Sequence, residues 1–362
     1  MLLDAGRRVV VTLALYGFVL LVLFGKAYAL VPSYFDRSLA VPHAPLVQLP
    51  LSAAGVVGLA LAPFGPGWVR PLGVGLWAAG VVVFLATLGW TLRDNPTGRE
   101  TGTGGATAHR EPVDKAANAV LPVALAYLAL GTLGHLWTLA GDSPLATMQV
   151  SHLLAAGTAA LFVFGVGLRL LPRFLVATPP RPLVAVVLPT GAVGPALLGF
   201  GLFDRGLLLV GGALETLAVG GFALAYVVLF VRSDRRRVGF YAVLAAVLAG
   251  VVGVALALVV AVTGRDPALV TAHYRTMLLG FLGLTVVGAA YQFYPPAVGQ
   301  VPLASDRTAL GSIALLTGGL GMQVVGLFGG WAALGTAGEA VALGGVVLYA
   351  WLLFGAFARQ RG

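Results

Sequence analysis

The chain has 362 residues, of which 59% are hydrophobic and 10% are charged, and its mean hydropathy is +0.96. Soluble domains of this size carry far more charge, so the composition predicts an integral membrane protein surrounded by the lipid bilayer. The absence of cysteine excludes disulfides, iron–sulfur clusters and thiolate ligation of haem. The net charge of +9 arises mainly in short loops, where basic residues orient a membrane protein, so we expect no nucleic-acid partner.

Apolar runs long enough to span a membrane make up most of the chain. A transmembrane helix needs about 20 apolar residues, and eleven candidate runs are separated by polar or helix-breaking residues. In chain order they cover residues 8–31, 46–63, 68–92, 116–140, 145–171, 182–203, 206–231, 238–263, 267–294, 308–329 and 334–357. The second run is short and contains Pro50, so it either re-enters the membrane or belongs to a longer span that begins near Pro42.

The pattern predicts an all-α, polytopic transmembrane helical bundle of eleven helices, or twelve if the count misses one. The stretch 93–115 is rich in Gly, Thr and charged residues, which cannot form a packed core, so we expect a flexible polar loop. This loop would separate an N-terminal three-helix membrane segment, residues 1–92, from an eight-helix bundle, residues 116–362, that carries the histidines described below.

The orientation follows from the loop arginines and lysines, which mark the cytoplasmic side. One set of loops is rich in them, and it holds Arg93, Arg99, Arg110, Lys115, Arg173, Arg181, Arg232, Arg235, Arg236, Arg237 and Arg307. The C-terminal tail lies on the same side, so we expect a cytoplasmic C-terminus in the plasma membrane of a prokaryote. Arg7 and Arg8 favour the opposite orientation of the first helix, and a helix count that is wrong by one would explain them.

Three histidines, His135, His152 and His273, lie in apolar runs at a similar predicted depth near the outer helix ends. Ionisable side chains inside a bilayer are costly and usually functional, and imidazole is the commonest protein ligand for haem iron and copper. A tight hairpin separates His135 from His152, so their helices should be neighbours. The three therefore predict a cofactor site, and the alternative is three histidines bonded to backbone or serine near the interface.

Two further charged residues lie within predicted spans. Arg275 shares the depth of His273 and needs an anionic partner, which a haem propionate, Glu215 or Glu339 would provide; snorkelling to the interface is the alternative. Glu215 lies in the middle of the seventh run. It is a candidate proton-transfer group, a partner of Arg275, or a protonated carboxyl bonded to a neighbouring helix.

Two of the four methionines lie four residues from a histidine, Met148 from His152 and Met277 from His273. Residues four apart share a helix face, and methionine with histidine suits copper or haem iron. Core packing is the competing use. Arg169 and Arg173 are interpreted as arginines that snorkel from a cytoplasmic helix end, and the loop histidines His43 and His109 are assigned no role.

An internal repeat relates two of the histidine helices. Gly157, Gly165 and Pro172 recur 123 residues later as the set Gly280, Gly288 and Pro295. The two histidines are offset by 121 residues instead, so the register differs at the candidate ligand. We interpret the match as a duplicated helix type, which is common in membrane bundles.

The stretch from Thr271 to Pro295 begins with His273, continues through Leu279-Gly280-Phe281 and Gly288, and ends in Tyr294-Pro295. It resembles ligand helices of the haem–copper oxidase subunit I superfamily. Residues 151–173, from Ser151-His152 to Leu171-Pro172-Arg173, are similar to the corresponding histidine helix of the NnrS family, a haem- and copper-containing relative linked to nitric oxide stress. The resemblance implies haem binding at His152 and His273.

The chain departs from the superfamily in its histidine set. Catalytic members use six histidines within the membrane, including an adjacent pair, whereas this chain has five histidines in total and no such pair. The resemblance therefore implies haem binding without oxygen reduction.

The sequence thus predicts a protein that binds haem b, with copper as an alternative metal, for electron transfer or the handling of a small gas such as nitric oxide. His135 would be a third ligand or a distal residue, and Arg275 a propionate partner. The partners would be a redox protein or a gas, and an oligomer or a complex subunit is the expected form of assembly. The alternatives are a copper or small-solute transporter without haem, and a structural subunit of a respiratory complex.

Overall fold

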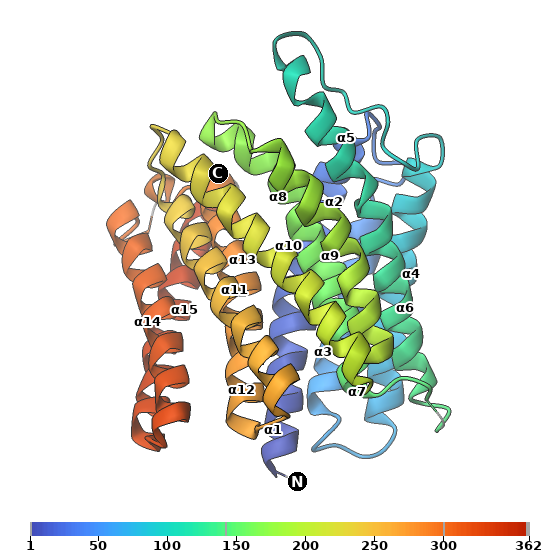
Figure 1. Cartoon of the computed structure of the whole chain (residues 1–362), viewed down its shortest axis with the longest axis vertical. Helices are drawn as coiled ribbons and strands as arrows, with labels where there is room; N and C mark the ends of the chain where they lie inside the picture. The colour runs from blue at the N-terminus through green and yellow to red at the C-terminus, as the bar shows by residue number, and fades with distance from the viewer. Residues whose placement is uncertain (1, 142, 300, 360–362) are drawn as a thin grey trace. The chain divides into compact units, whose positions relative to one another are not determined.

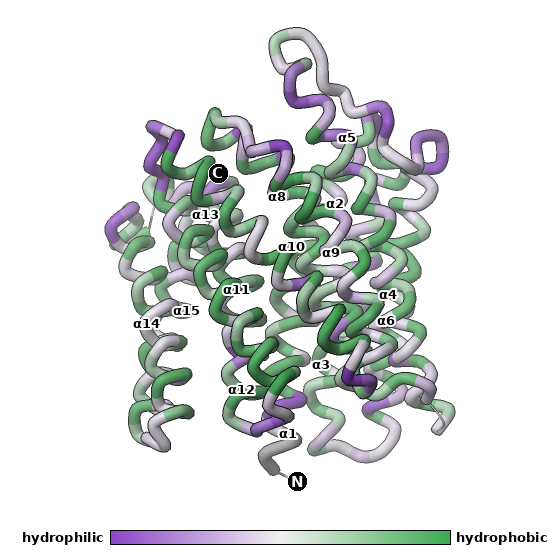
Figure 2. Tube along the Cα trace, viewed as in Figure 1, coloured by the Kyte–Doolittle hydropathy of each residue, from purple (hydrophilic) through white to green (hydrophobic). Residues whose placement is uncertain are grey.

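The computed structural model describes residues 2–141, 143–299 and 301–359. Every regular element in these ranges is helical, and eleven helices are long and apolar enough to cross a membrane (Figure 1). The predicted all-α polytopic bundle is therefore confirmed. In Figure 2 the helices are hydrophobic along most of their length, and hydrophilic residues gather at their ends and around α5.

Some spans are single elements and others are joined from two or three. The first is α1 (Leu2–Val11), η1 (Thr12–Leu20) and α2 (Leu21–Tyr34), followed by α3 (Ala44–Leu61) and α4 (Val69–Leu92). The fourth is η2 (Gly105–Arg110), α5 (Glu111–Ala119) and α6 (Leu121–Trp137), and the fifth is α7 (Thr147–His152), η3 (Leu153–Ala160) and α8 (Leu161–Leu175). Then come α9 (Arg181–Gly201), α10 (Arg205–Arg232) and α11 (Val238–Thr263). The ninth is α12 (Pro267–Arg275), η4 (Thr276–Gly283) and α13 (Leu284–Phe293), which η5 (Pro296–Val298) follows before α14 (Asp306–Gly329) and α15 (Ala332–Arg359).

The second span is a short continuous helix that runs through Pro50. It packs closely on α4, because two of its glycines lie against α4 backbone: a Cβ on Gly58 would lie 2.7 Å from Cα of Gly73, and Gly55 lies against Trp77. Small residues at a helix interface allow this approach of two backbones.

The polar stretch 93–115 is held against the helix ends by hydrogen bonds. The Asn95 side-chain amide donates to the carbonyl oxygens of Phe35 (3.0 Å) and Glu100 (2.8 Å). Arg37 donates to the Glu100 carboxylate at 2.7 Å, and this bond raises the pKa of Arg37. From residue 105 onward the stretch is helical and leads into the fourth span. The composition predicted a flexible loop because the stretch cannot pack apolar side chains. In the structure, hydrogen bonds from polar side chains hold it in place instead.

The chain forms two compact units. Unit 1 runs from the N-terminus to Phe174 and continues through Thr178–Gly221, and unit 2 comprises Leu175–Ala177 and the chain from Phe222 onward. The division falls within α10 and not at the polar stretch, because that stretch packs on the helices before and after it. His135 and His152 belong to unit 1, and His273 belongs to unit 2.

An aromatic row fills the core of unit 1. Tyr16, Phe24 and Tyr28 from the first span interleave with Trp77 and Phe84 from α4, with ring centroids 4.4–5.8 Å apart. Edge-to-face and tilted pairs of this kind stabilise a core beyond simple burial. In unit 2 the ninth span packs on α11, while α14 and α15 lie side by side (Figure 1).

Three spans contain a π-helical segment, and two of these segments repeat in register. The π-helical residues of the fifth span are Leu153–Ala160, and those of the ninth span are Thr276–Gly283. Each bound of the second segment lies 123 residues after its counterpart, which is the spacing of the Gly/Gly/Pro repeat. π-Helical turns are rare and frequent at functional sites, so this shared feature supports the interpretation of a duplicated helix type.

Candidate functional site

His152 lies near the start of the fifth span, immediately before its π-helical segment. Its Nδ1 lies 2.8 Å from the backbone oxygen of Met148, one turn earlier in the same helix. A carbonyl oxygen can only accept a hydrogen bond, so Nδ1 carries a hydrogen, and in the neutral imidazole Nε2 then carries the lone pair. Histidines that ligate metals commonly have this arrangement, because the bond at one nitrogen orients the other.

His273 has the same tautomer, set by a different helix. Its Nδ1 lies 2.9 Å from the backbone oxygen of Gly253 on α11, so Nδ1 donates and Nε2 again carries the lone pair. The absence of a side chain at Gly253 makes this contact feasible. Sδ of Met277 occupies the space that a Cβ on Gly253 would need, so this methionine packs on α11. Met148 is 39% exposed.

His135 differs from both, because its Nε2 is 2.5 Å from the hydroxyl of Tyr16. The two rings meet edge to face, with centroids 5.4 Å apart, and Tyr16 continues into the aromatic row through Trp77. α6 ends at Trp137, so His135 lies in its last turn, closer to the helix end than the sequence indicated. Its Nε2 is engaged by a phenol, which suits a positioning role better than iron ligation.

Arg275 has partners within unit 2. Its guanidinium lies 3.0 Å from the Glu339 carboxylate and donates to the buried side-chain oxygen of Gln323 at 2.8 Å. Of the anionic partners considered from the sequence, Glu339 is therefore the one that the structure places beside Arg275. This pair already balances the charge that a haem propionate would balance.

The described residues contain no cluster of three or more His, Cys, Asp or Glu side chains suited to holding a metal ion. Imidazole ligates both haem iron and copper, so the donor chemistry of His152 and His273 fits either metal.

A buried charged cluster, which the sequence did not predict, lies at the end of unit 1 where the fourth and fifth spans meet the polar stretch. Arg169 is only 3% exposed. Its guanidinium donates to the backbone oxygens of Tyr34 (2.6 Å) and Thr101 (2.5 Å) and to the side-chain oxygen of Asn118 (2.6 Å), and it stacks over the Tyr34 ring at 4.2 Å. Its interpretation as a snorkelling arginine is therefore wrong: backbone and amide oxygens satisfy its charge inside the protein.

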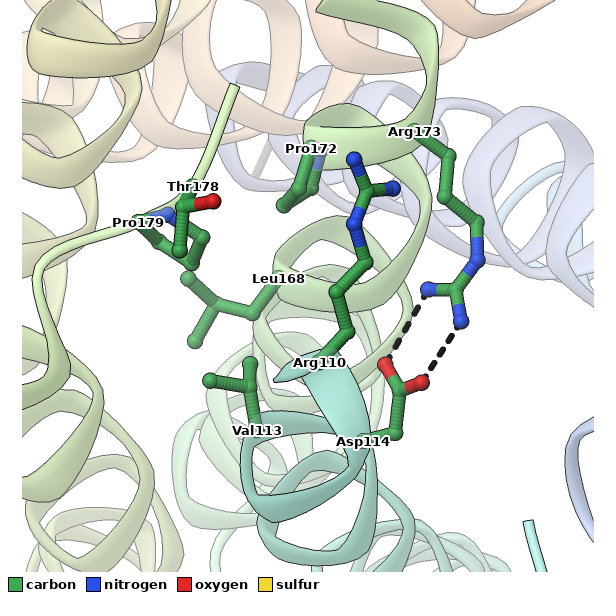
Figure 3. Close-up of a pocket in the computed structure, with 8 residues that line it drawn as sticks. All are labelled: Arg110, Val113, Asp114, Leu168, Pro172, Arg173, Thr178 and Pro179. Atoms are coloured by element: carbon green, nitrogen blue, oxygen red, sulfur yellow. Dashed lines mark hydrogen bonds and ion pairs between the residues drawn. The ribbon is translucent and has the colours of Figure 1, made fainter. Parts of the chain in front are cut away.

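Asp114 supplies the negative charge of this cluster. Arg173 donates two hydrogen bonds to the Asp114 carboxylate, at 3.0 and 2.6 Å, and Figure 3 shows this paired geometry beside a small pocket. Thr103 donates a third bond to Asp114 at 2.6 Å, and Nε of Arg169 lies 3.8 Å away. Charge-assisted bonds of this kind offset part of the cost of burying a carboxylate.

The sequence does contain a signal for this cluster. Asp114 and Asn118 are four residues apart on one helix, and Arg169 and Arg173 are four apart on another, so each pair shares a helix face. In contrast, no local pattern indicates that Tyr16 meets His135, because 119 residues separate the two in the chain. The backbone oxygen of Gly253 is likewise a partner that side-chain chemistry does not reveal.

A scan of the sequence against known protein families finds no match, and no curated protein matches it. The functional conclusion therefore depends on the site itself.

Proposed function

We propose that this chain is a haem-binding integral membrane protein that transfers electrons or binds a small gas such as nitric oxide. His152 in unit 1 and His273 in unit 2 are each a candidate axial ligand. The protein would lie in the plasma membrane of a prokaryote with its C-terminus in the cytoplasm, and it would act with a redox partner protein or a diffusing gas.

One observation carries the proposal: both histidines hold Nδ1–H against a backbone oxygen, so both present Nε2 as the basic nitrogen. A backbone bond of this kind also satisfies a histidine that is no ligand, so the spectral test below decides between the two roles. The order of histidine followed by a π-helical segment, found in both spans, adds support. The resemblance of these helices to haem–copper oxidase and NnrS helices agrees with the proposal.

Each residue has a defined task in this proposal. The carbonyls of Met148 and Gly253 orient the two imidazoles, and Tyr16 holds His135 in place. When bound, haem supplies a one-electron couple and an axial position that can accept a gas.

The test is a visible spectrum of the detergent-purified protein, oxidised and dithionite-reduced, with a pyridine haemochrome assay on the same sample. We expect a Soret band from haem b in the wild type. We expect loss or displacement of that band in His152→Ala or His273→Ala, and partial recovery when imidazole is added to the variant that lost a ligand.

His109→Ala is the matched control, because His109 lies in an exposed segment before α5, and this variant should keep its full haem content. A colourless wild type from cells well supplied with haem would overturn the proposal. Bound copper in that colourless protein would favour a transporter, and co-purifying subunits without a cofactor would favour a structural subunit.

A further inference from the structure

Glu215 on α10 is a buried carboxyl that neither the candidate haem ligands nor the charged cluster uses. It is 7% exposed, and it lies against α9 at Gly194, where a Cβ atom would come within 2.7 Å of its Oε1. Arg275, which the sequence offered as its partner, is paired with Glu339 instead.

The surroundings of Glu215 favour its neutral form. None of the ion pairs among the described residues involves Glu215, and its Oε1 has no hydrogen-bond partner among them. An isolated carboxylate in an apolar interior loses its hydration without compensation, and such a group takes up a proton instead of remaining charged. Asp114 shows the contrast, because two arginines and a threonine surround it.

α9, which packs against the Glu215 carboxyl of α10, contributes polar backbone groups. α9 runs continuously through Pro189 and Pro195, and because Pro195 has no N–H, the carbonyl of Gly191 lacks its intrahelical donor. One residue further, the carbonyl of Ala192 accepts a bond from the Tyr127 hydroxyl at 2.6 Å. Tyr127 on α6 is thus a titratable side chain that reaches this part of α9, and Phe164 of α8, which lies against Gly191, carries no charge.

These features form a set of polar groups inside a membrane-spanning unit. The set comprises a carboxyl, a phenol hydroxyl and one backbone oxygen that a proline leaves without its helical donor. A backbone group without its helical donor is tolerated at membrane depth where protein buries it or where it lines a water-filled cavity. Intramembrane carboxyls with such neighbours serve proton relays.

We propose that Glu215 is an exchangeable proton-binding site: it holds a proton at rest and releases and rebinds it through the polar groups of α9 and Tyr127. This assignment is independent of haem, since it concerns groups other than the histidines.

Infrared spectroscopy of the purified protein tests the proposal directly, because a protonated carboxylic acid has a C=O band distinct from those of carboxylates and amides. We expect this band in the wild type at neutral pH, a shift of the band on transfer to D₂O, and its loss in Glu215→Gln. Glu111→Gln is the matched control, because Glu111 is part of an exposed i,i+4 pair with Lys115, and it should keep the band.

A second measurement needs no variant. A hydrophobic carbodiimide reacts with a protonated carboxyl in lipid: the acid proton passes to one nitrogen, the carboxyl oxygen adds to the central carbon, and the acyl group migrates to the other nitrogen as a stable acylurea. We expect mass spectrometry to locate the adduct at Glu215, with less labelling as the pH rises. A wild type without the acid band, a band that does not shift in D₂O, or labelling absent from Glu215 would overturn the proposal.

Discussion

The fifth and ninth spans, which carry His152 and His273, share a repeat but differ near their C-terminal ends. With the 123-residue offset, Arg169 of the fifth span corresponds to Gln292 of the ninth. Arg169 has three close acceptors, whereas the amide nitrogen and oxygen of Gln292 are buried without a partner. In unit 1 the polar stretch 93–115 supplies one of these acceptors, the Thr101 carbonyl, and the ends of α2 and α5 supply the other two. The same helix position thus carries a charge where a loop satisfies it, and a neutral amide where none does.

The candidate ligands differ in a similar way. With the same offset, His152 corresponds to Arg275, and His273 corresponds to Val150. A shift of two residues turns a side chain about 200° around a helix. This explains why His152 bonds to its own helix whereas His273 bonds to α11. The repeat therefore preserves the helix type and the π-helical segment, while the imidazole faces another direction in each copy.

The largest expected effect comes from replacing Arg169 by glutamine, the residue type at the equivalent position 292 of the ninth span. Arg169→Gln removes the charge that Thr101, Tyr34 and Asn118 satisfy and leaves their oxygens buried. Breaking such a buried network costs roughly 3–5 kcal/mol. Thermal unfolding in detergent should show a large fall in Tm. An unchanged Tm would mean that the polar stretch contributes little to stability.

The equivalent glycines of the repeat should differ in tolerance. A Cβ on Gly288 would lie 2.6 Å from Val243 Cγ2 and 2.8 Å from the backbone oxygen of Gly239, whereas one on Gly165 would meet its nearest side-chain atom at 3.0 Å and its nearest backbone oxygen, that of Ala117, at 3.1 Å. Backbone yields less than side chains, so Gly288→Ala should destabilise by up to about 3 kcal/mol and Gly165→Ala by less. Unfolding curves of the two variants in one detergent give the comparison, and an equal or reversed order would contradict it.

The unpaired side-chain amide of Gln292 predicts a substitution that stabilises the protein. Gln292→Met keeps the length of the side chain and removes two buried polar atoms that lack partners. It should stabilise the protein by about 1 kcal/mol, since an unsatisfied buried group carries its desolvation cost. A lower Tm for this variant would show that the amide has a partner in the folded protein.

The smallest expected effect is that of Tyr16→Phe, which tests whether His135 differs in role from His152 and His273. Tyr16→Phe removes one hydrogen bond and keeps the ring packing on Trp77, so it should cost only about 0.5 kcal/mol. If His135 is not an iron ligand, haem content and the Soret band should match those of the wild type. A clear spectral change in this variant would place His135 at the iron.

The helices were predictable from the sequence because apolar runs of spanning length leave few alternatives. All eleven runs match helices, with shifts of a few residues at most ends. The fourth helix begins at Gly105, earlier than the predicted start at residue 116. The difference arises because α5 is polar, so its Asp114 and Asn118 do not raise the hydropathy of a predicted span. The Tyr16–His135 contact was not predictable, because it depends on how helices pack, which hydropathy does not specify. The tautomers of His152 and His273 depend on backbone oxygens and need coordinates.

Arg169 has a consequence for the biogenesis of the protein. Its partners Tyr34, Thr101, Asp114 and Asn118 all precede it in the chain, so they are synthesised before the fifth span leaves the ribosome. An arginine that enters a bilayer alone is costly, because no oxygen there satisfies its guanidinium. The oxygens that receive Arg169 come earlier in the chain, so we expect the fifth span to enter the membrane together with the assembly of unit 1.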